Sequence, residues 1–148
     1  MHSFTHILIH AVFSTKYRNA IITDEIRDEM HKYMGGVLRN LGCGAIVINS
    51  VEDHVHLLFW LSSTQTISFV MQELKRATSE WVTKRFSLFD FRWQNGYCAL
   101  SVDEYGIEKV KNYIYDQRAH HIDISFSDEL REIFRQNGME FNEQEAMD

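Results

Sequence analysis

The stretch His54-Val55-His56-Leu57-Leu58-Phe59-Trp60-Leu61 decides the fold of this chain and indicates its chemistry. Its apolar run is too short for a helix and predicts a buried β-strand. Side chains alternate along a strand, so His54 and His56 share one face, roughly 7 Å apart, while Val55 points to the other. Two imidazoles placed in this way can ligate one metal ion. The alternative is a pair of structural histidines, since the chain has eight histidines in all.

Segments on both sides of this strand predict the rest of a small antiparallel sheet. Residues 45–49 predict a strand that Glu52-Asp53 joins to the His54 strand by a tight turn, forming a hairpin. Residues 4–13 and 96–102 predict two further strands, because both are apolar and end near turn signals.

Helical spacing and capping residues predict the helices between these strands. Thr23 can cap a helix that ends at Gly42, and Thr66 can cap a second helix that reaches Phe86. Ser101-Val102-Asp103-Glu104 fits a capping box for a third helix that reaches about His121. Residues 127–136 predict a short final helix.

The element order β-α-β-β-α-β-α-α predicts an α+β fold. Split βαβ units of this kind build a ferredoxin-like antiparallel sheet, here expected with its helices packed on one face. A chain of 148 residues is expected to form a single domain over residues 1–148. No apolar run approaches the ~20 residues that a membrane span needs. Cys43 and Cys98 have no CxxC spacing, which favours reduced thiols and a cytoplasmic protein.

Charge is distributed unevenly along the chain. The net charge is −6, and residues 123–148 carry eight acidic and two basic side chains, which accounts for all of it. This stretch is therefore an acidic C-terminal helix and tail, and the remaining 122 residues are neutral. Local basic clusters in the neutral part are candidate DNA contacts, because phosphate binding depends on local charge. The alternative is that they are solvated helix faces. The clusters comprise Lys16, Arg18, Lys75, Arg76 and Arg92.

Tyr113 and Gln117 are four residues apart in a helical stretch and therefore lie on one face. A phenol close to a metal-bound phosphate can serve as a nucleophile, and Gln117 would complete a ligand set with the two strand histidines. The alternative is an amphipathic helix with Tyr113 in the core and Gln117 at its rim. His121 follows four residues after Gln117, so it is either an assisting or replacing ligand or an exposed helix end.

Three motifs in this order resemble a known family. They are Val51-Glu52-Asp53-His54-Val55-His56-Leu57-Leu58, then Trp93-Gln94-Asn95-Gly96-Tyr97, then Tyr113-Ile114-Tyr115-Asp116-Gln117 with His120-His121. From about residue 6 to 142 the chain resembles the single-tyrosine HUH transposases of small bacterial and archaeal insertion sequences. Relatives of that family are associated with repetitive extragenic palindromes.

The resemblance implies a role for each candidate residue. His54 and His56 would be the paired metal ligands, Gln117 the third ligand and Tyr113 the nucleophile. Tyr105 and Tyr115 are nearby, but neither has a glutamine four residues later. The resemblance also implies a homodimer, in which the helix carrying Tyr113 can complete the site of the other subunit.

The expected activity is the cutting and rejoining of single-stranded DNA through a 5′-phosphotyrosine intermediate. The expected cofactor is Mg²⁺ or Mn²⁺, and nitrogen ligands favour Mn²⁺. The expected partner is single-stranded DNA, including hairpin ends of a mobile element, and no membrane. Two alternatives are a non-catalytic module that binds single-stranded nucleic acid and a metal-dependent nuclease. Only the transposase predicts a stable covalent adduct between protein and DNA.

Overall fold

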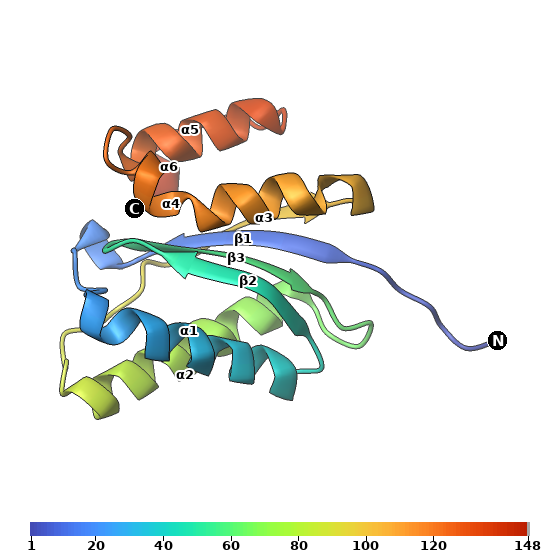
Figure 1. Cartoon of the computed structure of the whole chain (residues 1–148), viewed down its shortest axis with the longest axis horizontal. Helices are drawn as coiled ribbons and strands as arrows, with labels where there is room; N and C mark the ends of the chain where they lie inside the picture. The colour runs from blue at the N-terminus through green and yellow to red at the C-terminus, as the bar shows by residue number, and fades with distance from the viewer. Residues whose placement is uncertain (148) are drawn as a thin grey trace.

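A four-stranded antiparallel sheet organises the chain in the computed structural model, which describes residues 1–147. Its strands are β1 (Leu8–Ser14), β2 (Gly44–Ser50), β3 (His54–Trp60) and β4 (Cys98–Val102), in the order β2-β3-β1-β4. The predicted ferredoxin-like α+β fold is confirmed (Figure 1). The first strand begins at Leu8, later than expected, and the residues before it are exposed.

The His-Val-His strand lies inside the sheet, between β1 and β2. Val12 pairs with His56, and Ser14 pairs with His54 at the end of β1. Val55, Leu57 and Phe59 point into the larger core, while the histidines point to the opposite face. Both faces of this strand must be covered, because it is apolar on both.

Two long helices cover one face of the sheet. They are α1 (Asp24–Asn40) and α2 (Ile67–Phe86), and their buried side chains form the larger core with β1 and β3. Thr66 caps α2 as predicted, because its Oγ1 accepts a hydrogen bond from the Phe69 amide at 3.1 Å. Gly42 follows α1 with φ of 75°, a left-handed conformation that suits glycine.

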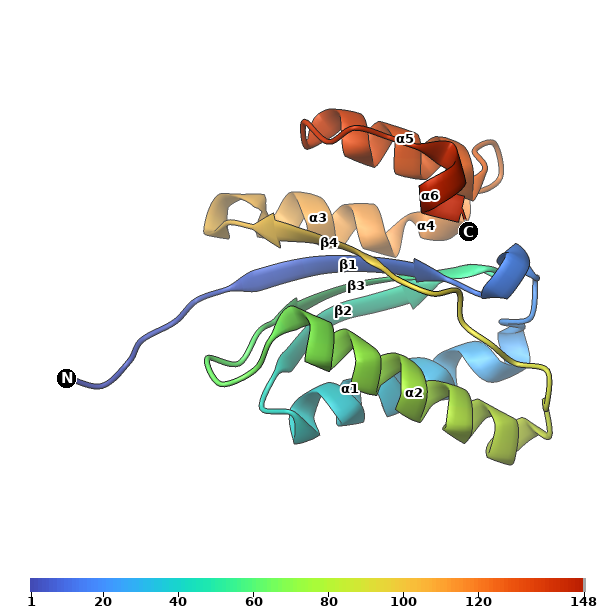
Figure 2. The same cartoon turned by 180° about the vertical axis from the view of Figure 1, so that it is seen from behind.

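The opposite face carries a second helical layer, which the expectation of helices on one face did not include (Figures 1 and 2). It consists of α3 (Ile107–Tyr115), α4 (Gln117–His120) and α5 (Phe126–Gln136). Ile114 packs on Leu8 and Leu58, and Phe126 and Leu130 pack on Val12. These apolar strand residues face away from α1 and α2, so a second layer has to bury them.

The start and end of the third helix differ from the prediction. Ser101 lies within β4. Asp103 caps a short 3-10 helix (Glu104–Gly106) that precedes α3, because its Oδ1 accepts from the Gly106 amide at 2.7 Å, and α3 itself has no side-chain cap. The helix expected to continue to His121 is interrupted at Asp116 into α3 and α4. A short helix α6 (Glu143–Met147) follows α5 in the acidic tail, where no helix was expected. Among the described residues, no helix combines the length and apolar character that a bilayer crossing requires.

Candidate active site

His54 and His56 form the floor of the site from their positions on β3. Both side chains are fully buried, and their ring centroids lie 5.3 Å apart. Nε2 of each ring points toward the second helical layer, where both nitrogens approach the same carboxylate oxygen. The shared face that strand alternation predicts is present in the structure.

Two neighbouring side chains contact Nδ1 of the two rings, on the side away from the site. Nδ1 of His54 lies 2.6 Å from Oδ1 of Asp53, and Nδ1 of His56 lies 2.9 Å from Nε2 of His10. Burial, and then the charge of His56, lower the pKa of His10 to about 3, so His10 is neutral and its Nε2 can accept a hydrogen bond from Nδ1 of His56. These contacts leave Nε2 of His54 and His56 directed into the site, as for metal-ligating histidines.

Tyr113 and Gln117 reach the histidines from the ends of α3 and α4. The Asn49 side-chain amide donates to the carbonyls of Ile114 and Tyr115, at 2.9 and 3.1 Å, and so ties the end of α3 to β2. The Tyr113 ring lies 5.7 Å from the His56 ring, centroid to centroid. Gln117 is fully buried, and its Oε1 has no hydrogen-bond partner.

Glu129 on α5 occupies the centre of the site, and the sequence reasoning missed it. Its Oε1 lies 3.1 Å from Nε2 of His54 and 2.9 Å from Nε2 of His56. Its Oε2 accepts hydrogen bonds from the Tyr113 hydroxyl at 2.5 Å and from Gln117 Nε2 at 3.0 Å. The available signal was its position three residues after Phe126, on the buried face of an amphipathic helix, where a carboxylate is unusual.

His121 also belongs to this cluster. Its Nε2 lies 3.1 Å from Glu129 Oε1, although the geometry is not that of a hydrogen bond. One ligand atom from each of His54, His121 and Glu129 can be chosen so that all three lie within 4.8 Å of one another. Of the two roles left open for His121, the structure therefore favours a place in the site over an exposed helix end.

The electrostatics of the site couple the carboxylate to the imidazoles. Burial would raise the pKa of Glu129, but the close contacts with the imidazoles of His121, His54 and His56 hold it far below its usual range. Burial lowers the pKa of His54, but its contacts with Asp53 and Glu129 raise it by more. The pKa of His54 is therefore above its ordinary value. Glu129 is therefore a permanent anion at the point where the imidazole nitrogens converge.

The pKa of Tyr113 moves well above its ordinary value. Burial is the main cause, followed by the negative charge and the hydrogen bond of Glu129. The phenol is therefore a protonated donor in the metal-free site, and a cation close to it would favour the phenolate.

The residues present suit a divalent cation. The unpartnered Oε1 of Gln117 is a buried acceptor that a carboxylate cannot satisfy and a cation can. Together with the Nε2 atoms of His54 and His56 it offers the predicted mixed nitrogen and oxygen set, which Mn²⁺ and Mg²⁺ accept.

The predicted phosphate contacts separate into two groups. Lys16, Arg18 and Arg92 are exposed, and the Lys16 amide bonds to the Arg92 carbonyl at 2.9 Å. They lie at the end of the sheet that carries the site, since the Thr15 amide bonds to the Asp53 carbonyl at 2.8 Å.

The Arg92 guanidinium donates to the carbonyls of Phe89 and Phe91, at 3.1 and 2.7 Å. Lys75 and Arg76 are also engaged with the chain itself. Lys75 Nζ donates to the carbonyls of Gln94 and Gly96, both at 2.6 Å, and burial lowers its pKa to about 8. Arg76 is paired with Glu73 and Glu80 on its own helix.

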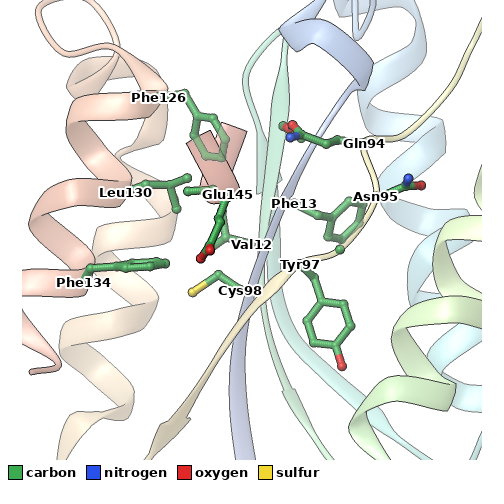
Figure 3. A pocket seen from close by; sticks show the side chains of 13 residues that line it. Val12, Phe13, Gln94, Asn95, Tyr97, Cys98, Phe126, Leu130, Phe134 and Glu145 are labelled. Atoms are coloured by element: carbon green, nitrogen blue, oxygen red, sulfur yellow. The ribbon is translucent and has the colours of Figure 1, made fainter. Parts of the chain in front are cut away.

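A cavity of about 160 Å³ adjoins the site between α5 and the loop before β4 (Figure 3). Gln94 and Tyr97 lie on the loop side, and Phe126 and Leu130 on the helix side. The Phe126 ring also stacks on His54, with centroids 4.2 Å apart and planes inclined by 24°. Phe126 is therefore a wall shared by the cavity and the histidine cluster.

Comparison with known proteins identifies the family. The family described as "Transposase IS200 like" matches residues 3–117. The chain belongs to the IS200-like transposase family. The match contains His54, His56, Tyr113 and Gln117, whereas Glu129 and the whole of α5 lie beyond it.

Individual relatives of this IS200-like transposase agree with the family. The ISDra2 transposase TnpA of Deinococcus radiodurans is 25% identical over 114 residues, which cover 73% of this chain and 81% of the relative. A crystal structure of a candidate transposase from Deinococcus radiodurans R1 aligns with a TM-score of 0.63 and 22% identity, covering 79% of this chain and 95% of that one. A REP-associated tyrosine transposase bound to a REP hairpin aligns with a TM-score of 0.62 and 14% identity, covering 82% of this chain and 72% of that one. These two structures share the fold of this chain.

Proposed function

We propose that this IS200-like transposase cuts and rejoins single-stranded DNA through a covalent 5′-phosphate linkage to Tyr113. The observation that carries the proposal is the Tyr113 hydroxyl, which lies 2.5 Å from Glu129 Oε2 beside two buried histidines of β3. A tyrosine in the core of a helix face would not need such a polar environment.

His54, His56 and Gln117 are the proposed holders of Mg²⁺ or Mn²⁺. Such an ion supplies positive charge that polarises a phosphate and stabilises the transition state. The unpartnered Oε1 of Gln117 supports this assignment, because it is a buried acceptor without a donor.

The reaction transfers one phosphodiester bond to the protein and back. The phenolic oxygen of Tyr113 forms a bond to phosphorus, and the bond between phosphorus and the 3′-oxygen breaks. The phenolic proton is released to solvent, while the hydrogen bond to Glu129 holds the hydroxyl in place beforehand, and the departing 3′-oxygen takes up a proton from solvent. Attack of another 3′-hydroxyl on the linkage restores the phosphodiester and frees Tyr113. Because the phosphotyrosine linkage keeps the energy of the broken bond, no nucleoside triphosphate is needed.

Single-stranded DNA fits the surroundings of the site. Lys16, Arg18 and Arg92 supply positive charge at the end of the sheet beside Asp53. The cavity next to the site is walled by aromatic rings, including Tyr97 and Phe126, on which an unpaired base can stack (Figure 3). The hairpin in the complex of the REP-associated relative supports a hairpin end as the recognised element.

A homodimer remains part of the proposal, on the basis of family membership. Tyr113 contacts the histidine cluster of its own chain, so one subunit contributes all the groups of one site. We therefore propose sites that are complete in cis, and not shared between subunits.

The test uses a pool of hairpin-containing single-stranded oligonucleotides with Mn²⁺, resolved on a denaturing gel. A 3′-labelled strand should become linked to the protein, and a 5′-labelled strand should become shorter, because Tyr113 keeps the 5′-phosphate side. Chelation with EDTA should remove both products. Shortened strands without an adduct would indicate a hydrolytic nuclease, and unchanged strands that are still bound would indicate a binding module.

A further inference from the structure

Glu129 is a buried ionisable group that the motif of the family does not account for. It lies on α5, beyond the matched residues 3–117, and only 5% of its surface is exposed. An unpaired carboxylate is costly to bury, so its location at the meeting point of the imidazoles needs an explanation.

The distances around Glu129 are those of a coordination shell as well as those of hydrogen bonds. Oε1 lies 3.1 Å from His54 Nε2, 2.9 Å from His56 Nε2 and 3.1 Å from His121 Nε2. In an octahedral site with bonds of ~2.1 Å, neighbouring ligand atoms are about 3.0 Å apart. The oxygen therefore stands at the spacing from the imidazoles that a ligand of the same ion would have.

The second oxygen of the carboxylate faces the nucleophile. Oε2 accepts from the Tyr113 hydroxyl at 2.5 Å and from Gln117 Nε2 at 3.0 Å. Rotation of the Gln117 amide by half a turn exchanges its nitrogen and oxygen, which would bring the unpartnered Oε1 to the same point. A cation there would then face oxygen from both residues.

The packing of α5 fixes the carboxylate in this position. Ser125 caps the helix by accepting from the Asp128 amide at 3.2 Å. Phe126 stacks on the His54 ring, and Leu130 packs with Val12 of β1. The residues on either side of Glu129 therefore hold it against β3.

We propose that Glu129 is itself a ligand of the divalent ion, with Oε1 on the ion and Oε2 holding the Tyr113 hydroxyl. The proposal rests on the metal site of the proposed function and adds a residue from outside the family motif to it. His54, His56 and Gln117 are all neutral as ligands, so they leave two positive charges of a buried ion uncompensated. A carboxylate offsets one of them and is the ligand type that Mg²⁺ and Mn²⁺ prefer.

The alternative role is that of a blocking group, which an ion has to displace. The two roles make opposite predictions for metal affinity, since removal of a ligand weakens binding and removal of a competitor strengthens it. The probe is Mn²⁺ alone, added to the full-length protein without DNA. Free Mn²⁺ is measured by electron paramagnetic resonance.

Glu129→Gln is expected to weaken Mn²⁺ binding by about tenfold or more. The loss of a residue that only hydrogen-bonds to a metal ligand already lowers metal affinity by about 10- to 100-fold. The matched control is Glu132→Gln, which makes the same change one turn later on α5. Glu132 is exposed and paired with Arg135. The control should bind Mn²⁺ as the unmodified protein does.

Unchanged or tighter Mn²⁺ binding by Glu129→Gln would overturn the proposal. Circular dichroism verifies that the variant is folded, and if it is not, Glu129→Asp carries the same expectation, since it keeps the charge but retracts the carboxylate by one methylene. The readout is independent of cleavage. If the unmodified protein forms the DNA adduct but Glu129→Gln keeps full affinity, only the ligand role fails. If no adduct forms, the proposed function fails and the titration still decides the role of Glu129.

Discussion

Nδ1 of His54 lies 2.6 Å from Oδ1 of Asp53, the residue immediately before it in the chain. The contact orients the ring and directs Nε2 toward Glu129, 3.1 Å away on a helix 75 residues later. A turn residue at the start of β3 thus determines which nitrogen of His54 faces the site.

Joint metal binding by the two strand histidines is the first prediction. His54→Ala and His56→Ala should each lower Mn²⁺ affinity in calorimetry by about tenfold or more. Asp53→Asn should lower it by a smaller factor, because the ring keeps its ligand atom but loses the partner that orients it. Full affinity in either alanine variant would mean that the pair is structural.

The second prediction concerns the nucleophile. Tyr113→Phe removes one oxygen and should reduce adduct formation by at least about a thousandfold while DNA binding remains. The control is Tyr115→Phe, two residues later, whose side chain is exposed and far less enclosed than Tyr113. Adduct formation that survives in Tyr113→Phe and disappears in Tyr115→Phe would transfer the assignment to Tyr115.

The third prediction concerns DNA contact at the exposed basic turn after β1. Charge reversal of Lys16 and Arg18 should weaken binding of single-stranded DNA regardless of its sequence. Each lost phosphate contact should lower the slope of log affinity against log salt by about 0.7. Lys32→Glu on α1 is the control, since α1 covers the face of the sheet opposite to α3, α4 and the active site. An equal loss with Lys32→Glu would point to a general charge effect.

The fourth prediction is a dependence of stability on pH through His31. Its Nε2 lies 2.8 Å from Ser50 Oγ, and burial, followed by the charge of Arg27, lowers its pKa to about 4. Below about pH 6.5, His31 binds a proton in the unfolded chain but not in the folded chain. The folded state therefore loses stability as pH falls from 6.5 toward 4.

Urea unfolding at pH 7.5 and 5.5 measures the effect of His31. Between these pH values, the free energy of unfolding should fall by about 1 kcal/mol more in the unmodified protein than in His31→Gln, which has no titrating ring. Identical pH dependence of the two proteins would show that His31 does not carry it.

The fifth prediction concerns subunit sharing. His56→Ala protein mixed with Tyr113→Phe protein should recover no cleavage after subunit exchange, because each cis site keeps one lesion. Recovery of about half the activity of an intact dimer would instead indicate that Tyr113 serves the partner's histidines. Light scattering on the mixture establishes whether a dimer is present at all.

Local patterns in the sequence were enough to predict the sheet and half of the site. Alternation along β3 put His54 and His56 on one face, and the four-residue spacing put Tyr113 and Gln117 on one helical face. Both patterns depend on backbone periodicity, which neighbouring residues determine. The ferredoxin-like order followed from the sequence of strands and helices and is confirmed.

Only the tertiary structure decided what these faces meet. Periodicity indicates that a face is buried but not which element buries it, so the second helical layer and the break at Asp116 were missed. Glu129 looked like one of eight acidic residues in a solvated tail. The docking of Phe126 and Leu130 on β1 and β3 carries its carboxylate to the imidazoles. Contacts between residues 75 positions apart, such as His54 and Glu129, leave no periodic trace in the chain.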